Sequence, residues 1–117
     1  KLNISTIIIT HDLSIVAEIC DKIVIMYAGK IAELGSTSEV YRDPKHPYSK
    51  GLIDAFPNIL EPKRRLRAIE GFPPDLLDPP PGCRFHPRCP YAMEICSKKE
   101  PLSVDIGKEH MAACHLY

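Results

Sequence analysis

The sequence has no net charge, no long apolar run and, in its first part, no proline. Its 117 residues contain 15 lysines and arginines and 15 aspartates and glutamates, so the formal net charge is zero. A chain without a dominant charge offers no general electrostatic basis for binding nucleic acid, a membrane surface or an acidic substrate. Its longest apolar runs, around 7–9 and 23–27, are far shorter than the roughly 20 residues that cross a bilayer. The length and these absences predict one modest domain without a transmembrane helix.

The start of the chain lacks the basic residues and long apolar segment of a secretory signal, so we expect none. Residue 1 is Lys, and a β-branched apolar run begins at Ile4. The run 4–9 is continuous, which is typical of a strand buried on both faces in a parallel sheet. Such a strand needs neighbours and nothing precedes it, so we interpret the chain as a piece of a longer protein rather than a processed, complete domain.

Proline and cysteine are distributed unevenly. Residues 1–43 contain no proline and one cysteine, and 22 of these 43 residues are hydrophobic, nine of them isoleucine. Residues 44–117 contain all 12 prolines and four of the five cysteines. The first part is therefore typical of a packed core, and the second of a loop-rich appendage.

Two strands are predicted after the first helix. They lie at 22–27 and 30–34 and are joined by a two-residue turn in which Gly29 can adopt a positive φ. In the second of them, Glu33 is expected to point outward. This pair of strands is expected to form a hairpin at the edge of a sheet.

Three short helices are predicted from capping residues. Asp12 can cap the first helix. One face of that helix is apolar: Leu13, Val16, Ala17 and Cys20. Ser36 and Glu39 have the spacing of a capping box, so a second helix should begin there and end before Pro44. A third helix is expected over 48–55.

The pattern weakens after residue 58. A basic run at 63–67 is most simply a solvated face. The segment 71–82 contains too many prolines and glycines for a helix or a central strand, so turns or polyproline II are expected.

His11 follows directly after the first predicted strand. In open parallel α/β sheets, ligands bind beyond the carboxyl ends of the strands. An imidazole there can donate a hydrogen bond to a phosphate oxygen or orient a water molecule. Taken alone, a histidine in this place is more often a surface or capping residue.

Four cysteines, separated by five, six and seventeen residues, are candidate metal ligands: Cys83, Cys89, Cys96 and Cys114. Disulfides would need an oxidising compartment, and structural zinc favours closer pairs than these. A Cys₄ iron–sulfur cluster fits best, because such clusters are held by thiolates on irregular loops and Cys89-Pro90 resembles the end of a ferredoxin run. A mixed site that includes His86, His110 or His115 stays open.

Residues beside the cysteines suit an anionic site. Arg84 and Arg88 would favour thiolates by their positive charge. The apolar side chains of Phe85, Tyr91 and Ile95 could shield the site from water.

Segment 7–13, which contains Thr10-His11-Asp12, and segment 20–31 together resemble the switch-histidine region of ABC transporter ATP-binding domains. The resemblance implies that His11 contacts the γ-phosphate of ATP and is a catalytic and nucleotide-binding residue. The phosphate loop, glutamine loop, signature motif and Walker B carboxylates of that family would lie upstream of this sequence. Without a phosphate cradle and magnesium ligands, this chain alone should neither bind ATP tightly nor hydrolyse it.

A second resemblance covers the rest of the chain. The segments 46–49, 71–74, 81–92 and 113–116, together with Cys96, resemble the C-terminal region of oligopeptide and dipeptide ABC importer ATPase subunits. Members of that family can carry a four-iron cluster on four such cysteines. The resemblance thus implies a 4Fe-4S cluster ligated by Cys83, Cys89, Cys96 and Cys114.

These resemblances imply an α/β fold in two parts. Residues 1–57 would be the C-terminal remnant of an ABC ATPase domain, with a buried strand, a helix, a β-hairpin and short helices. Residues 58–117 would be an irregular, proline- and cysteine-rich metal-binding domain. The full-length protein would bind ATP and magnesium and drive peptide import at the cytoplasmic face of the membrane. Its expected partners are permease subunits and a second ATP-binding subunit.

Two other functions would use the same cysteines. One is a small iron–sulfur electron carrier, in which His11 has no role. The other is a zinc-stabilised nucleic-acid binder that uses the basic run at 63–67, although zero net charge and few aromatic residues count against it. The unpaired strand 4–9 further predicts that the chain forms a homodimer through its open edge.

Overall fold

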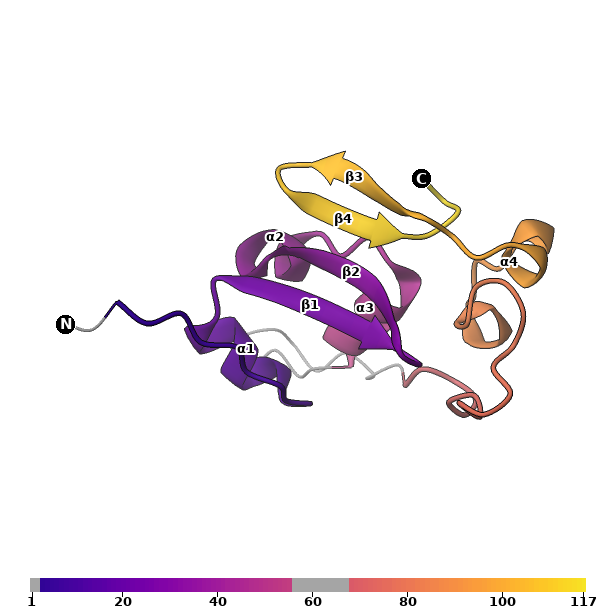
Figure 1. Cartoon of the computed structure of the whole chain (residues 1–117), viewed down its shortest axis with the longest axis horizontal. Helices are drawn as coiled ribbons and strands as arrows, with labels where there is room; N and C mark the ends of the chain where they lie inside the picture. Colours follow the sequence, from indigo (N-terminus) through magenta and orange to yellow (C-terminus); the bar gives the residue numbers. More distant parts are fainter. Residues whose placement is uncertain (1–2, 56–67) are drawn as a thin grey trace.

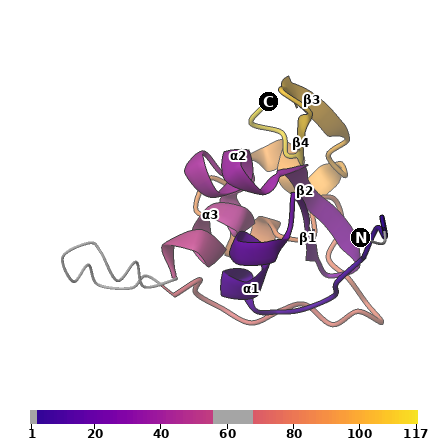
Figure 2. The same cartoon turned by 90° about the vertical axis from the view of Figure 1, so that its left-hand side faces the viewer.

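The computed structural model describes residues 3–55 and 68–117. Four strands form one antiparallel sheet in the order β1-β2-β4-β3: β1 (Lys22–Tyr27), β2 (Lys30–Ser36), β3 (Ser103–Gly107) and β4 (His110–Ala113). Three helices lie on one face of this sheet (Figures 1 and 2): α1 (Leu13–Ile19), α2 (Thr37–Arg42) and α3 (Pro47–Asp54). A 3₁₀ helix, η1 (His86–Arg88), and a short helix, α4 (Glu94–Lys98), belong to the cysteine-rich segment.

The core lies between the sheet and these three helices. Strand β1 forms where it was predicted; its side chains alternate strictly between exposed and buried, and Ile23 and Ile25 pack against Val40 of α2. Leu13 and Val16 of α1 cover the same cluster from the side. Burial of such side chains, at about 25 cal/mol per Å² of apolar surface, is the main force that holds these helices to the sheet.

The β1–β2 turn consists of Ala28 and Gly29, both with positive φ (47° and 78°). Such a turn matches the right-handed twist of the strands that it joins. The register then shifts by one residue, because Ile25 pairs with Glu33 and the next residue pairs with Ile31. Because of this β-bulge, Ile31 and Glu33 lie on opposite faces of the sheet although they are two residues apart: Glu33 is completely buried and Ile31 is 48% exposed. The prediction of an outward Glu33 was therefore wrong.

The predicted buried strand 4–9 is also wrong for the described chain. Residues 3–10 have no regular secondary structure, and Ile7 and Ile9 are 93% and 97% exposed. A strand buried on both faces needs a neighbouring strand and covering helices, and residues 3–55 and 68–117 supply neither for this segment.

The three predicted helices are confirmed, with small differences at their ends. The Asp12 carboxylate accepts hydrogen bonds at the start of α1, and the Ser36 hydroxyl accepts one from the Glu39 N–H at the start of α2. The His46 ring caps α3, which begins at Pro47. Segment 71–82 has no helix or strand, as expected, whereas the basic run 63–67 lies outside the described residues. Among the described helices, none is long and apolar enough to span a bilayer.

The second part of the chain is more ordered than a loop-rich appendage. Strand β4 pairs with β2, opposite to β1, with Glu33 facing Ala112 across the ladder. Phe85 is 2% exposed, and its ring lies 5.1 Å from the ring of Tyr27 and 5.4 Å from that of Tyr48. Both parts thus share one sheet and adjoining cores, which the alternation of residue types did not indicate.

Candidate functional site

The first candidate residue, His11, lies on the surface just before α1. It is exposed, and its ring makes no hydrogen bond with any residue that the structure describes. The neighbouring backbone is fixed, because Thr10 Oγ1 accepts a hydrogen bond from the Asp12 N–H (3.0 Å) and Asp12 Oδ1 accepts one from the Ser14 N–H (2.9 Å). An exposed imidazole on a fixed backbone can bind an anionic oxygen of a ligand.

The second candidate is the group of four cysteines, which we call the thiol cluster: Cys83, Cys89, Cys96 and Cys114. They come from four places in the fold, namely the loop before η1, the end of η1, helix α4 and the residue after β4. The Cys83 N–H donates a hydrogen bond to the Cys96 carbonyl (2.7 Å). Cys114 lies near the other cysteines although 30 residues separate it from Cys83, so the fold brings all four to one corner of the molecule.

The thiols of the cluster are close enough to affect one another's ionisation. Burial raises the pKa of Cys83, Cys89 and Cys114, and neighbouring cysteines raise each of these pKa values further. The N–H groups of Phe85 and Tyr91 oppose this by hydrogen bonding to the sulfurs of Cys83 and Cys89.

The thiol cluster does not converge on a single point. All four cysteines are free thiols, and no three His, Cys, Asp or Glu residues within the described ranges are arranged to hold a metal ion. The donor set nevertheless suits a metal with thiolate ligands, because it combines four half-buried or buried sulfurs with N–H groups directed at them. The residues therefore fit such a group chemically, although their sulfurs must move to bind it.

Gly82 sets the path of the chain into the cluster. Its φ is +71°, and a Cβ at this position would lie 2.3 Å from the carbonyl oxygen of Cys96. Only glycine allows this close approach between the loop before Cys83 and helix α4.

The two arginines near the cluster do not serve the thiols. The Arg84 guanidinium donates to the Ala28 carbonyl at the β1–β2 turn. The Arg88 guanidinium donates to Tyr27 Oη (3.2 Å) and to the carbonyl oxygens of residues 69 (3.3 Å), 70 (2.9 Å) and 71 (3.2 Å). The predicted support of thiolates by both arginines is not borne out, because their guanidinium groups bind carbonyl oxygens and Tyr27 instead, and burial raises the pKa of Cys83, Cys89 and Cys114. Both arginines instead tie the cysteine-rich segment to other parts of the fold.

The expected shielding of the thiols is only partly present. Phe85 is buried and packs with Cys83 and Cys89, whereas Tyr91 and Ile95 are 54% and 43% exposed.

Each histidine near the cluster already uses a ring nitrogen elsewhere. His86 Nδ1 lies 2.8 Å from the Cys83 carbonyl, and His115 Nε2 lies 2.7 Å from the Lys99 carbonyl. His110 is buried against Glu33, with 2.6 Å between Nε2 and Oε1. A metal-bound histidine commonly makes such a contact with its other ring nitrogen, so these contacts leave both an all-cysteine and a mixed site open.

Sequence reasoning missed a buried polar network around Glu33. Its carboxylate accepts hydrogen bonds from the N–H groups of Lys45 (2.9 Å) and His46 (2.8 Å), in addition to its contact with His110. Burial lowers the pKa of His46 to about 4, and the nearby Glu33 carboxylate only partly opposes this shift. No local pattern marks Glu33, because its burial results from the bulge and from a strand 77 residues away.

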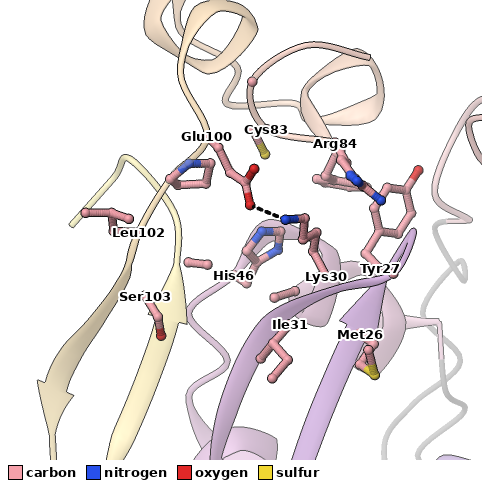
Figure 3. Close-up of a pocket in the computed structure, with 16 residues that line it drawn as sticks. Met26, Tyr27, Lys30, Ile31, His46, Cys83, Arg84, Glu100, Leu102 and Ser103 are labelled. Atoms are coloured by element: carbon pink, nitrogen blue, oxygen red, sulfur yellow. Dashed lines mark ion pairs between the residues drawn. The ribbon is translucent and has the colours of Figure 1, made fainter. Parts of the chain in front are cut away.

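A cavity of about 520 Å³ lies beside the thiol cluster (Figure 3). Cys83 and the buried His46 line it, and an ion pair between Lys30 Nζ and Glu100 Oε1 (2.9 Å) crosses its side. The cavity therefore separates the tip of the β1–β2 hairpin from the loop that leads into β3.

Comparison with known proteins identifies the family. A family model described as "Oligopeptide/dipeptide transporter, C-terminal region" matches residues 32–96, more than half of the chain. The chain belongs to this family. The match runs from β2 through α4, so it includes three cysteines of the thiol cluster. The resemblance seen in the sequence is thereby confirmed.

Curated relatives of this family member are ATP-binding proteins of peptide transport. The "Dipeptide transport ATP-binding protein DppD" of Caldanaerobacter subterraneus is 45% identical over 116 residues, which is 99% of this chain and 36% of the relative. DppD of Bacillus subtilis is 42% identical over 99% of this chain and 35% of the relative. The "Oligopeptide transport ATP-binding protein OppD" of Escherichia coli is 50% identical over 87% of this chain and 30% of the relative. The chain thus spans about a third of the length of these relatives.

Proposed function

We propose that the chain is the C-terminal part of the ATP-binding subunit of an oligopeptide or dipeptide importer, which couples ATP hydrolysis to peptide uptake. The observation that carries this proposal is the 45% identity to a dipeptide transport ATP-binding protein over 116 of the 117 residues. The match of residues 32–96 to the transporter family agrees with it. An electron carrier or a zinc-stabilised binding module finds no counterpart among these relatives.

In this function, His11 is the residue of the described chain that acts on ATP. Its exposed ring follows a backbone held by Thr10 and Asp12, so it can donate a hydrogen bond to the γ-phosphate. The full-length subunit would supply the phosphate loop and the magnesium ligands, which this sequence does not contain. Residues 1–117 alone should therefore not hydrolyse ATP.

The thiol cluster would hold a metal group, and four cysteine ligands suit a 4Fe-4S cluster. Such a group would cross-link the loops at 83–96 to Cys114, the residue that follows β4. This part of the chain has few apolar residues. We assign it a structural role: the residues around it would be held by ligation where a hydrophobic core is lacking.

The proposal also assigns partners and a boundary. ATP-binding subunits of this kind act with permease subunits and a second ATP-binding subunit at the cytoplasmic face of the membrane. Residues 1–57 would belong to the ATPase domain and 58–117 to the accessory domain. The exposed isoleucines of segment 4–9 support pairing of the isolated chain with a second copy, which a monomer in sedimentation at high concentration would contradict.

The ATPase assignment is tested in the full-length protein with its permease. His11→Ala should lower ATP turnover by about a hundredfold or more while nucleotide binding is retained. Glu18→Ala, an exposed change on the same helix, should leave turnover unaffected. Normal turnover of His11→Ala would overturn the role of His11.

The metal assignment is tested by anaerobic purification, visible absorption and metal analysis. We expect a brown protein with iron and sulfide, which Cys89→Ser loses and Cys20→Ser keeps. A colourless protein with zinc would replace the iron–sulfur assignment, and a metal-free native protein would overturn both.

A further inference from the structure

Helix α1, which follows His11, is held to the fold by few contacts. It has seven residues, and none of them is fully buried. Leu13 and Val16 are only partly buried against the core cluster. The direction of α1, and of the residues that precede it, therefore depends on hydrogen bonds from its neighbour α2.

Helix α2 is a firm support for α1. Val40 is fully buried and Thr37 is 7% exposed, so one side of α2 is embedded in the core. At the far end of α1, Thr37 Oγ1 donates to the Cys20 carbonyl (2.6 Å) and the Thr37 N–H donates to the Asp21 carbonyl (2.9 Å). These bonds fix the end of α1 that is remote from His11.

At the near end, α2 contributes a single side chain. The Tyr41 hydroxyl donates to the Leu13 carbonyl, in the first turn of α1 and two residues after His11. The same hydroxyl lies near the Asp12 carboxylate: burial raises the pKa of Tyr41, and the charges of Cys20 and Asp12 raise it further. Tyr41 is therefore a neutral donor directed at the turn that carries His11.

We propose that Tyr41 is a positioning residue for ATP hydrolysis, because its hydroxyl fixes the first turn of α1 and thereby aims His11. The inference rests on the proposed function of His11. The turn is then held on two sides, by the Asp12 cap from within and by the Tyr41 hydroxyl from α2. Loss of the hydroxyl leaves the ring packing and the ATP-binding residues intact, so it affects turnover rather than binding.

The test uses the full-length protein with its permease, and Tyr41→Phe, which removes one oxygen atom. We expect kcat for ATP to fall about threefold to tenfold, with KM changed less than about twofold. Thr37→Val is the matched control, since it removes a hydrogen bond of similar burial at the other end of α1. It should change kcat less than about twofold.

Two further measurements separate positioning from general loosening. Tyr41→Phe should have no additional effect on kcat when His11 is already alanine, because both substitutions remove the same function, that of a correctly placed His11 ring. Hydrogen exchange of the Ser14 and Ile15 amides should be faster in Tyr41→Phe, with α2 unchanged, and this readout does not depend on activity.

The possible failures are distinguishable. Normal turnover of His11→Ala overturns the proposed function and this inference with it. Impaired His11→Ala combined with normal kcat in Tyr41→Phe overturns the inference alone. If Thr37→Val lowers kcat as much as Tyr41→Phe does, Tyr41 has a merely structural role. The same conclusion follows if the effects of Tyr41→Phe and His11→Ala on kcat are additive.

Discussion

The helix-covered half of the molecule and its cysteine-rich half are stabilised by different interactions. In residues 13–54, apolar side chains of β1 pack against three helices, and hydroxyl and carboxylate groups cap those helices. In residues 68–117, the β2–β4 ladder and the buried ring of Phe85 are supplemented by hydrogen bonds from arginines and histidines to backbone carbonyls. The comparison teaches that a segment poor in apolar residues can still be fixed in place by strand pairing, one buried aromatic ring and side-chain hydrogen bonds to backbone carbonyls.

Glu33 joins the two halves, and its loss should have the largest effect. Glu33→Ala leaves the N–H groups of Lys45 and His46 and the ring of His110 without their buried acceptor. We expect a destabilisation of about 3–5 kcal/mol, measured as a lowered unfolding midpoint of the full-length protein. Glu33→Gln, which keeps the shape and one acceptor oxygen, should cost about 1–3 kcal/mol. Equal stability of Glu33→Ala and wild type would show that the halves are held together elsewhere.

The junction should also be sensitive to acid through His46. The folded pKa of about 4 lies below the ordinary value of 6.5, so the unfolded chain binds more protons between these values. Stability from this group is complete above pH 6.5 and decreases by about 3 kcal/mol as the pH falls to about 4.

His46→Asn isolates this contribution, because asparagine can still cap α3 but does not titrate. The unfolding midpoint of the variant should depend less on pH between 6.5 and 4 than that of the wild type. Parallel pH profiles of the two proteins would refute the assigned cause.

Within the cysteine-rich half, Gly82 offers a sharper test of how the loops are packed. Gly82→Ala should cost about 2–3 kcal/mol and lower the metal content, because the new Cβ clashes with the Cys96 carbonyl as well as straining φ. Gly107→Ala is the control: φ is +101°, but nothing lies within 4 Å of its added Cβ. Gly107→Ala should cost only about 1 kcal/mol. If both substitutions lowered stability equally, backbone strain alone, and not the clash with Cys96, would explain the loss at Gly82.

The smallest effect is expected at Arg88, where geometry and charge can be separated. Arg88→Lys keeps the charge but loses the fork that binds Tyr27 and three carbonyls, so we expect a loss of about 1–2 kcal/mol. Arg42→Lys, at an exposed arginine of α2, should change stability by less than about 0.5 kcal/mol. If Arg88→Lys is as stable as the wild type, the positive charge of residue 88, and not its guanidinium hydrogen bonds, stabilises this segment.

Local patterns predicted the elements that depend on neighbouring residues. The strand at 22–27, the turn at 28–29 and the caps at Asp12 and Ser36 all involve residues within a few positions of each other. Segment 4–9 failed for the opposite reason, because a doubly buried strand is defined by partners that a short pattern does not contain.

The candidate site shows the same limit. Motif resemblance singled out His11 and the four cysteines, and the structure brings these cysteines to one corner. The resemblance did not indicate Glu33 or the targets of Arg84 and Arg88, since these depend on contacts between residues 12 to 77 positions apart.

The pairing of β2 with β4 has a consequence for synthesis of the chain. Glu33 and Ala112 are partners in the ladder, so one edge of β2 keeps unpaired N–H and carbonyl groups until residues 110–113 have been made. Because long-range pairing is slow and open strand edges attract other chains, a ribosome-bound chain that stops short of β4 would expose an aggregation-prone edge. The last eight residues therefore protect the nascent first half during translation, and their removal should lower soluble yield before it alters any ligand site.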